Sequence, residues 1–368
     1  MTSAPHTCEL FFNLYIKNLK AYNIFTMTDT DDRLVAAEEN AEENLLDRAL
    51  RPETLGDFVG QNNIKKNLEI ALSAAKKRGD VLEHIMLYGN PGLGKTTLAH
   101  IIAREMGSNI KIIAGPTLEK VGDLSAILSN LQQGDILFID EIHRLNKTIA
   151  EVLYPALEDF VLDIVIGQGP AARTIRMPIA PFTLIGATTK ISLLPVPLRD
   201  RFGHVYHLNF YEPDEIETIV GRSAKLLQIE IEPTAIKLIA TRARRTPRIA
   251  NRLLKRVRDY AEVHTDALIN QNAANSALAM LAIDELGLDE IDRHLLNTLI
   301  EKFNGGPTGL NTLAAAIAEE MDTIETVYEP YLLQLGFLER TPRGRKASPA
   351  AYKHLGHIVP PGQTNANL

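Results

Sequence analysis

The sequence predicts an α/β domain with a parallel sheet between two layers of helices, then an all-helical domain, then small helices with a basic hairpin. Three observations lead to this prediction. Between about residues 55 and 208, short apolar runs alternate with helical patterns, which is typical of a parallel sheet. From residue 214 to 281 only helical patterns occur. Beyond residue 284, three short helical patterns lead into a glycine turn and a basic stretch.

The α/β region contains four apolar runs that we expect to be buried strands, at residues 84–88, 110–113, 136–139 and 182–185. Between the first two, apolar residues recur at helical spacing and Gly107 follows as the expected helix end. The predicted domains are therefore an α/β domain at 45–210, a helical domain at 211–283 and a third domain at 284–356, with an N-terminal extension at 1–44 and a flexible tail at 357–368.

The composition limits the classes of protein to which the chain can belong. With 45% hydrophobic and 23% charged residues, each domain can form an ordinary soluble core. The formal net charge of −7 means that any DNA must be held by local basic patches. Cys8 is the single cysteine, which excludes an internal disulfide and favours a reducing cytoplasm.

The first residues do not indicate a membrane protein. The apolar stretch at 10–25 is interrupted by Lys17 and Lys20, and it is too short for a membrane span. It also lacks the features of a signal peptide. Met27 opens a polar, acidic stretch, and we take it as a candidate for the true start. We therefore expect a cytoplasmic protein that does not contact a membrane.

A glycine-rich loop is the most specific motif. Residues 89–96 read Gly-Asn-Pro-Gly-Leu-Gly-Lys-Thr, and they follow an apolar run and open a helical pattern, as a P-loop requires. Gly92 and Gly94 let backbone N–H groups curl around phosphate oxygens, and the helix start adds positive charge. Lys95 would reach the β- and γ-phosphates of ATP, and the Thr96 hydroxyl would bind Mg²⁺. The alternative, a chance glycine turn, does not explain this context.

Two acids follow the third expected strand. Asp140 would hold Mg²⁺ in its outer shell, and Glu141 would polarise the attacking water. A plain solvated strand end is the alternative, but the P-loop 45 positions upstream favours the catalytic interpretation. An adjacent Asp-Glu pair also favours hydrolysis of ATP over nucleotide storage.

Further candidates follow the fourth expected strand. Thr189 could hydrogen-bond the γ-phosphate or the water, although a threonine at a strand end is common. Arg199 and Arg201 could neutralise transition-state charge in a neighbouring subunit, or they could be paired surface residues. Arg248 follows Pro247 at an expected helix start, so it could point back to the nucleotide, whereas most other basic residues at 242–258 would form a solvated helix face.

The order of these motifs resembles AAA+ ATPases, and six strings resemble the RuvB family in particular. These strings lie at residues 92–99, 140–145, 169–173, 197–203, 246–253 and 340–345. The resemblance covers about residues 45 to 356 and leaves out the first 26. It implies an AAA+ P-loop core, an all-helical lid and a C-terminal winged-helix domain. Asn90 departs from the family, which usually has proline there, without changing the donors of the loop.

The resemblance also implies roles for individual residues. Leu50 and Arg51 would contact the adenine side, Thr189 would be the first sensor and Arg248 the second. Arg201, rather than Arg199, would be the arginine finger. The phosphates would be held by Gly92, Lys95, Thr96 and Thr97, and the nucleotide pocket would be completed by Glu158, Asp159, Phe160 and Tyr211.

Two expected hairpins would bind partners. Residues 161–179 alternate like strands around Gly167-Gln168-Gly169, with exposed-looking Ile164 and Ile166. They could pack on their own sheet, but the resemblance implies that they dock RuvA. In the C-terminal hairpin, Arg340, Arg343 and Arg345 could form a solvated face, but the resemblance implies that they contact DNA. We expect them to bind its phosphates without reading the sequence, with Arg340 and Arg345 as the preferred pair.

The resemblance implies a homohexameric ring that drives branch migration of Holliday junctions with RuvA and the RuvC resolvase, in recombination and repair. Two alternatives share the ATP site. An AAA+ remodeller of the clamp-loader kind would lack the basic hairpin, and an ATP-switched DNA-binding initiator would hydrolyse ATP slowly.

Overall fold

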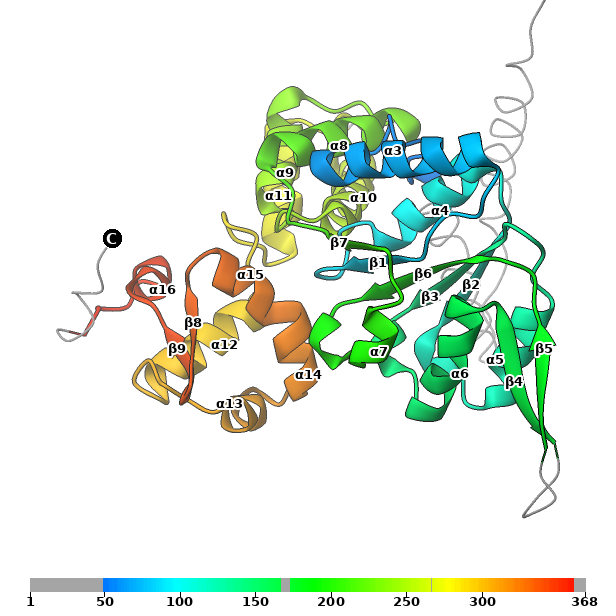
Figure 1. Ribbon diagram of the computed structural model, residues 1–368. Coiled ribbons are helices and arrows are strands. Elements are labelled where there is room, and N and C mark those ends of the chain that lie inside the picture. Colours follow the sequence, from blue (N-terminus) through cyan, green and yellow to red (C-terminus); the bar gives the residue numbers. More distant parts are fainter. Residues whose placement is uncertain (1–48, 167–172, 266, 361–368) are drawn as a thin grey trace, which may run out of the picture. The chain divides into compact units, whose positions relative to one another are not determined.

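The computed structural model describes residues 49–166, 173–265 and 267–360 of the chain. Contacts divide the chain into a first unit that ends at Arg51 and a second that begins at Pro52. Within the described residues, no helix combines the length and apolar character needed to cross a membrane. The second unit contains the three predicted domains except for the first residues of the α/β domain, and it is coloured from blue to red in Figure 1.

The large domain is built on a five-stranded parallel sheet in the order β2-β3-β6-β1-β7 (Figure 1). Apolar runs of four to six residues form its strands, and each of the four predicted strands is present. The strands are β1 (Ile85–Tyr88), β2 (Ile110–Ala114), β3 (Ile136–Asp140), β6 (Thr183–Thr188) and β7 (His204–His207). The prediction of a buried strand was wrong for β2, because β2 is an edge strand with partly exposed side chains. The other edge strand, β7, was not predicted, because His204 and His207 interrupt its apolar pattern.

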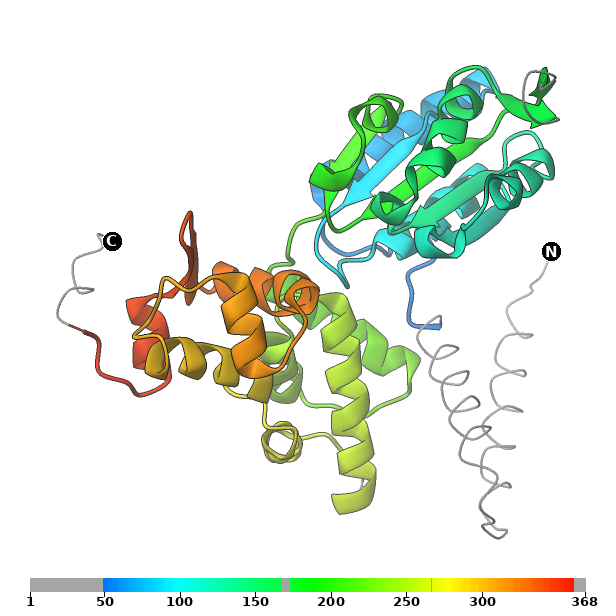
Figure 2. The ribbon, with the colours of Figure 1, turned by 90° about the horizontal axis from the view of Figure 1, so that it is seen from below.

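Helices cover both faces of this sheet. One apolar cluster joins residues of α3 and α4 to β1, and a second joins residues of α5, α6 and α7 to β3 and β6. Figure 2 shows the sheet between its two helical layers. Gly107 ends α4 in the left-handed conformation, as predicted. The helices are α3 (Asn62–Arg78), α4 (Lys95–Met106), α5 (Val121–Ser129), α6 (Lys147–Glu158) and α7 (Val196–Arg199), with short 3-10 turns at Gly115–Thr117 (η1), Ile142–Arg144 (η2) and Ile191–Leu193 (η4).

A hairpin of β4 (Val161–Ile166) and β5 (Arg173–Pro178) extends from the large domain beyond the sheet (Figure 1). It confirms the predicted antiparallel pairing, whereas its predicted turn at 167–169 lies outside the described residues. The expectation that Ile164 is exposed was wrong, because this side chain is half-buried against the second apolar cluster. Ile175 on β5 is the exposed isoleucine, with 51% of its surface accessible. The side chain of Ile166 lies outside the described residues.

The second domain is helical, as predicted. Its long amphipathic helix α10 buries one apolar face and exposes Arg252 and Arg256 on the other. The solvated interpretation of most basic residues at 242–258 was wrong, because Arg244 and Lys255 are buried and three others are half-buried. Pro247 is the first residue of this helix, where the absent N–H of proline costs nothing. The helices are α8 (Pro213–Leu226), α9 (Pro233–Arg242), α10 (Pro247–His264) and α11 (Gln271–Met280).

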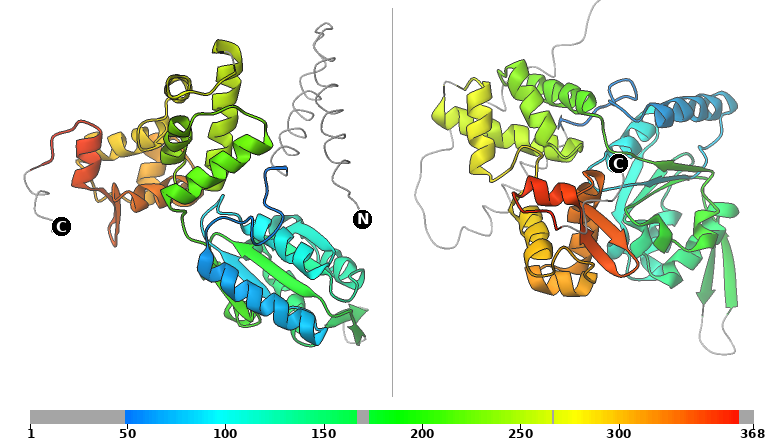
Figure 3. Two further views of the ribbon diagram at one scale, coloured as in Figure 1. Left: turned by 90° about the horizontal axis from the view of Figure 1, so that it is seen from above. Right: turned by 90° about the vertical axis from the view of Figure 1, so that its left-hand side faces the viewer.

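The third domain packs three helical segments and a short final helix around its own apolar cluster. A hairpin of β8 (Leu338–Thr341) and β9 (Gly344–Ala347) projects from these helices, as Figure 3 shows. This combination confirms the predicted winged-helix fold. The helices are α12 (Glu290–Glu301), α13 (Leu310–Ile317), α14 (Met321–Thr323), the π-helical turn η5 (Ile324–Tyr328), α15 (Glu329–Gln334) and α16 (Pro349–His354).

Candidate nucleotide site and basic hairpin

The glycine-rich loop lies where three strands of the sheet end. It follows β1, whose carboxyl end lies beside that of β6, and the Gly89 N–H donates to the Thr188 carbonyl at 3.2 Å. Asp140 is the last residue of β3, the next strand in the sheet. The carboxyl ends of parallel strands are the usual place of a binding site in such sheets. The fold therefore brings together the predicted loop, acid pair and threonine.

The loop needs small residues where its backbone lies close to other parts of the protein. Gly92 has a φ of +79°, and a Cβ atom there would lie 3.0 Å from the Cβ of Arg248. The Arg248 N–H donates to the Gly92 carbonyl at 3.4 Å, which joins the loop to the start of α10. The helix α4 begins at Lys95, as predicted, so its unpaired N–H groups are directed at the loop.

Two cations and two hydroxyls line this loop. Lys95 is buried, and its Nζ donates to the carbonyls of Gly89 at 2.7 Å and Asn90 at 2.9 Å. Burial lowers the pKa of Lys95 to about 8, and the carboxylates of Asp140 and Glu141 partly offset this effect. Thr96 and Thr97 are half-buried in the first turn of α4. An anion near Lys95 would stabilise its charged form, so the loop is suited to bind phosphate.

Arg248 supplies the second cation. Its side chain is exposed, and it makes no hydrogen bond or ion pair with any residue that the structure describes. Its position beside Gly92 agrees with the prediction that it points back toward the nucleotide loop.

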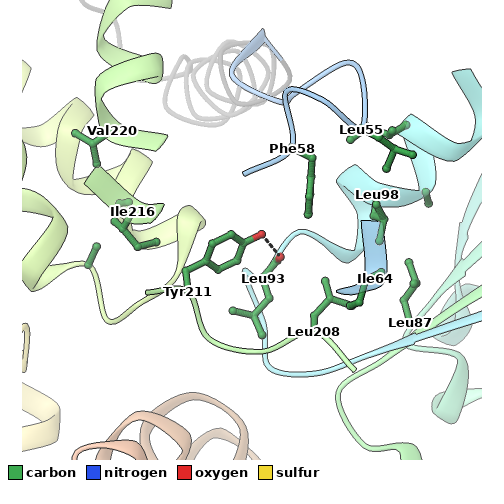
Figure 4. Packing of buried hydrophobic residues seen from close by; sticks show 14 of the residues in the cluster. Leu55, Phe58, Ile64, Leu87, Leu93, Leu98, Leu208, Tyr211, Ile216 and Val220 are labelled. Carbon is green, nitrogen blue, oxygen red and sulfur yellow. Dashed lines mark hydrogen bonds between the residues drawn. The ribbon is translucent and has the colours of Figure 1, made fainter. Parts of the chain in front are cut away.

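Tyr211 packs against the loop and binds its backbone. Its hydroxyl donates to the Leu93 carbonyl at 3.1 Å, as Figure 4 shows, and the ring is almost fully buried. Burial raises the pKa of this phenol. Tyr211 therefore contacts the loop backbone, and its predicted place at the nucleotide pocket stays a prediction. Phe58 lies on the same side of the loop, and a Cβ atom at Gly94 would lie 3.3 Å from its ring.

Glu141 is held by two neighbours at the ends of β3 and β6. The Thr189 hydroxyl lies 3.3 Å from the Glu141 Oε2, and the His143 Nδ1 lies 3.2 Å from the same oxygen. Asp140 accepts the Glu141 N–H at 3.0 Å, which fixes the turn between the two acids. His143 was not among the residues predicted from the sequence, although it lies within one of the strings that carry the family resemblance. The arrangement holds the Glu141 carboxylate in place, and a carboxylate is a suitable general base for a water molecule.

The site could hold a divalent cation with only a few ligands from the protein. Among the described residues, no group of three or more His, Cys, Asp or Glu side chains is arranged to hold a metal ion. Mg²⁺ usually keeps several waters and binds through one or two protein oxygens together with the substrate phosphates. The Thr96 hydroxyl and the Asp140 carboxylate provide oxygens of that kind.

Arg201 lies apart from the loop in its own subunit. Its Nη2 donates to the Glu158 carboxylate at 2.5 Å, and its guanidinium lies 5.5 Å from the centre of the Tyr154 ring. Asp159 lies 3.9 Å from Arg176 of the hairpin. Phe160 packs edge-on against Phe182, with the ring centres 6.1 Å apart. The fold thus groups Arg201 with the residues at 158–160 and does not bring them to the glycine-rich loop.

Three other predicted residues have different surroundings. Arg199 is exposed, and its side chain makes no hydrogen bond or ion pair with any described residue. Leu50 is buried and Arg51 half-buried, and both belong to the first unit of the chain. Their predicted contact with the adenine stays a prediction.

The basic hairpin uses its arginines in two ways. Arg340 and Arg345 both pair with Glu329, which is fully buried, at 2.5 Å and 2.6 Å. Arg345 also donates to Glu325 at 3.2 Å and is mostly buried. Arg343 lies in the turn, is exposed, and has no side-chain partner among the described residues. Arg343 is therefore the arginine most available to a phosphate, although the sequence had favoured Arg340 and Arg345.

Comparisons with known proteins agree with this geometry. Residues 50–208 match the model of the Holliday junction DNA helicase RuvB P-loop domain, residues 211–284 the RuvB AAA lid domain, and residues 285–356 the RuvB C-terminal winged helix domain. The chain is similar to the Holliday junction branch migration complex subunits RuvB of Dehalococcoides mccartyi and Chloroflexus aurantiacus. Each is 57% identical over 329 residues, which is 89% of this chain and 94% of that protein. The solved structure of the Thermotoga maritima RuvB Holliday junction branch migration motor is 54% identical, with a TM-score of 0.78, and the match covers 85% of this chain and all of that one.

Proposed function

The chain belongs to the RuvB family, and on that premise we propose that it is an ATP-hydrolysing motor that moves duplex DNA to drive branch migration of Holliday junctions. The observation that carries this proposal is the meeting of the phosphate loop with Glu141 and Thr189 at one sheet edge, in a chain that also carries a basic hairpin. The reaction would place the protein among the ATP-dependent DNA helicases of the cytoplasm, acting in recombination and repair.

The nucleotide would be held by the loop and by α4. Backbone N–H groups from Gly92 to Thr97 and the Lys95 ammonium would bind the phosphates of ATP. Thr96 would bind Mg²⁺ directly and Asp140 through water. Glu141 would accept a proton from the attacking water, with Thr189 placing that water or the γ-phosphate. Arg248, whose side chain is exposed and has no partner among the described residues, would contact the γ-phosphate from the lid.

Arg201 would act on the nucleotide of a neighbouring subunit in a hexameric ring. Its own pair with Glu158 lies on the surface and away from the glycine-rich loop, so a neighbour must bring its nucleotide to Arg201 for the guanidinium to act. Glu158, Asp159 and Phe160 would then border that neighbour's nucleotide, as Leu50 and Arg51 would border the adenine. Because an arginine finger contributes about 10³- to 10⁵-fold to turnover, mixed rings of Lys95→Ala and Arg201→Ala subunits should regain ATPase activity. No recovery despite mixed assembly would count against this role.

The two hairpins would bind the partners. The β8–β9 hairpin would contact DNA phosphates without reading bases, with Arg343 as the leading residue and Arg340 and Arg345 beside it. The β4–β5 hairpin, with its exposed Ile175, would dock RuvA, and RuvC would join the complex that resolves the junction. The basic hairpin disfavours a clamp-loader-like remodeller that acts on protein alone.

The decisive experiment is branch migration of a synthetic four-way junction, with and without RuvA and ATP. The wild-type protein should dissociate the junction only when RuvA and ATP are both present. Glu141→Gln should bind ATP and the junction yet leave the junction intact, because it lacks only the carboxylate that accepts the proton. An ATP-switched initiator would bind DNA with ATP but would not move the junction, so a bound and intact junction with the wild-type protein would refute the motor.

A further inference from the structure

The supports of Glu141 form a closed set of polar contacts. Thr188 receives a hydrogen bond on its hydroxyl from the Lys190 N–H at 2.9 Å, and the same hydroxyl lies 2.8 Å from the His143 Nδ1. His143 and Thr189 both touch the Glu141 carboxylate. The turn after β6 and the short helix η2 after Glu141 therefore hold this carboxylate between them.

Each of these two supporting residues is followed in the sequence by a basic residue. Lys190 follows Thr189, and Arg144 follows His143. Both cations reach the same carboxylate, that of Asp322 in α14 of the winged-helix domain. The Lys190 ammonium donates a hydrogen bond to Asp322, and the Arg144 Nη2 lies 4.0 Å from it. We call these three residues the Asp322 contact.

On the winged-helix side, the contact leads to the basic hairpin. Lys190 Nζ also lies 3.5 Å from Glu325, which is three residues after Asp322 in the π-helical turn η5. Glu325 accepts a hydrogen bond from Arg345 of β9 at 3.2 Å. Short π-helical turns are uncommon and are often found at functional sites. One carboxylate thus touches both a neighbour of the ATP site and an arginine of the DNA-binding hairpin.

We propose that Asp322 is a positioning residue for ATP hydrolysis, which acts through Lys190 and Arg144 on the two supports of Glu141. This role rests on the proposed function, because it links turnover to the contact of the hairpin with DNA. Binding of DNA phosphates to the hairpin would change the pair of Arg345 with Glu325. Because Glu325 and Asp322 both contact Lys190, the surroundings of Lys190 would change, and the support of Glu141 would change with them. Asp322 does not touch the nucleotide, so it changes the rate and not the binding of ATP.

The contact is suited to be made and broken. The Asp322 side chain is 56% exposed and that of Lys190 is 24% exposed, so water can replace either partner. A two-state element that both sites bias is the physical requirement for coupling between them.

The test is the steady-state ATPase rate of the full-length protein with and without duplex DNA. Asp322→Ala should lower the DNA-stimulated kcat by about 2- to 30-fold, the range that residues between coupled sites produce. The KM for ATP and the affinity for DNA should stay within about 2-fold, because Asp322 belongs to neither binding surface. Asp322→Glu should restore stimulation. Glu320→Ala, which removes an exposed acid two positions away, is the matched control and should behave as wild type.

A charge exchange separates positioning from folding. The double variant Lys190→Asp with Asp322→Lys should recover stimulation that each single variant lacks. Full stimulation in Asp322→Ala would overturn the positioning role and leave the motor proposal intact. A loss in Asp322→Ala that neither Asp322→Glu nor the charge exchange repairs would show a structural role and would also overturn it. A wild-type protein whose ATPase does not respond to DNA would refute the proposed function and this inference together.

Discussion

The winged-helix domain contacts its two neighbours in opposite ways. Toward the lid, Arg244 is buried, donates to the Gly287 carbonyl at 2.8 Å, and pairs with Asp289 and Asp292 at the start of α12. We call these four residues the buried joint. Toward the ATPase domain, the Asp322 contact joins the exposed side chains of Asp322 and Arg144 to Lys190, which is partly open to water.

The difference follows from the surroundings of the charges. A buried pair that loses one partner leaves an uncompensated charge, which is strongly destabilising, whereas an exposed pair exchanges with water at little cost. The lid and the winged-helix domain should therefore move as one piece, and the Asp322 contact should open first. A motor needs one stiff and one breakable connection of this kind. A movement of the lid that begins at Arg248 reaches the winged-helix domain only if the two domains are joined stiffly.

The largest effect is expected when the buried joint loses its arginine. Arg244→Ala leaves the Asp292 carboxyl buried without its cation and removes the contact with the Tyr331 ring, so it should destabilise the fold by about 3–5 kcal/mol. Arg245→Ala is the matched control. The backbone of Arg245 has a positive φ, as that of Arg244 does, but its side chain pairs with Glu212 at the surface. It should cost about 1 kcal/mol or less. Urea denaturation of both variants checks this, and equal costs would contradict a buried joint.

The next effect concerns the backbone of the same joint. Gly287 has a φ of +81°, and a Cβ atom there would lie 2.4 Å from the Arg242 carbonyl oxygen. Gly287→Ala should therefore cost about 2–4 kcal/mol, through backbone strain and overlap together. Gly79→Ala has a similar φ of +71° with nothing near its Cβ, so it should cost only about 1–2 kcal/mol. Thermal unfolding of the two variants measures the difference, and its absence would show that lid and winged-helix domain are not tightly joined here.

The sequence predicted the local chemistry of the site and not its long-range contacts. The P-loop, the Asp140–Glu141 pair and Thr189 were found because each is a short pattern at a strand end, and the parallel sheet then brings such ends together. His143 beside Glu141 was missed because a histidine on a short turn has no periodic signal. The pair of Lys190 with Asp322 spans 132 positions and the pair of Arg244 with Asp292 spans 48, so no local pattern indicates them.

Two environments could not be predicted from the sequence, for the same reason. The apolar run of β2 indicates a strand but not whether a neighbour covers both its sides. The basic string at 340–345 indicates a charged hairpin but not that the buried Glu329 pairs with two of its arginines. In both, the environment of a side chain depends on residues distant in the sequence.

A third prediction separates the two contacts by pH. Burial raises the pKa of Asp292 to about 7, while Arg244 opposes that shift. The folded protein therefore keeps a proton that the unfolded chain releases above about pH 4. The contribution of this carboxyl to the free energy of unfolding should fall as pH rises from about 4 to about 7, and should be constant above that.

Asp322 should behave in the opposite way. Its hydrogen bond with Lys190 lowers the pKa of Asp322, so its contribution is complete at neutral pH and is lost only as pH falls through that lowered value. Urea denaturation between about pH 5 and 8 tests both residues. The difference in free energy of unfolding between wild type and Asp292→Asn should change with pH, and that between wild type and Asp322→Asn should not. A constant difference for Asp292→Asn would mean that this carboxyl stays charged in the joint.

The smallest effect is expected from breaking the Asp322 contact alone. Because both side chains reach water, Asp322→Ala should change the free energy of unfolding by about 1 kcal/mol or less. Salt should remove even this, since charges at the surface are screened over about 3 Å at 1 M ionic strength. Urea midpoints at low and high NaCl measure the effect, with Arg244→Ala as the comparison whose cost should persist in salt. A small, salt-sensitive cost for Asp322→Ala, together with its expected loss of DNA stimulation, would separate coupling from stability. A cost as large and as insensitive to salt as that of Arg244→Ala would instead mean that the winged-helix domain is fixed to the ATPase domain as firmly as to the lid, and the idea of one stiff and one breakable connection would be wrong.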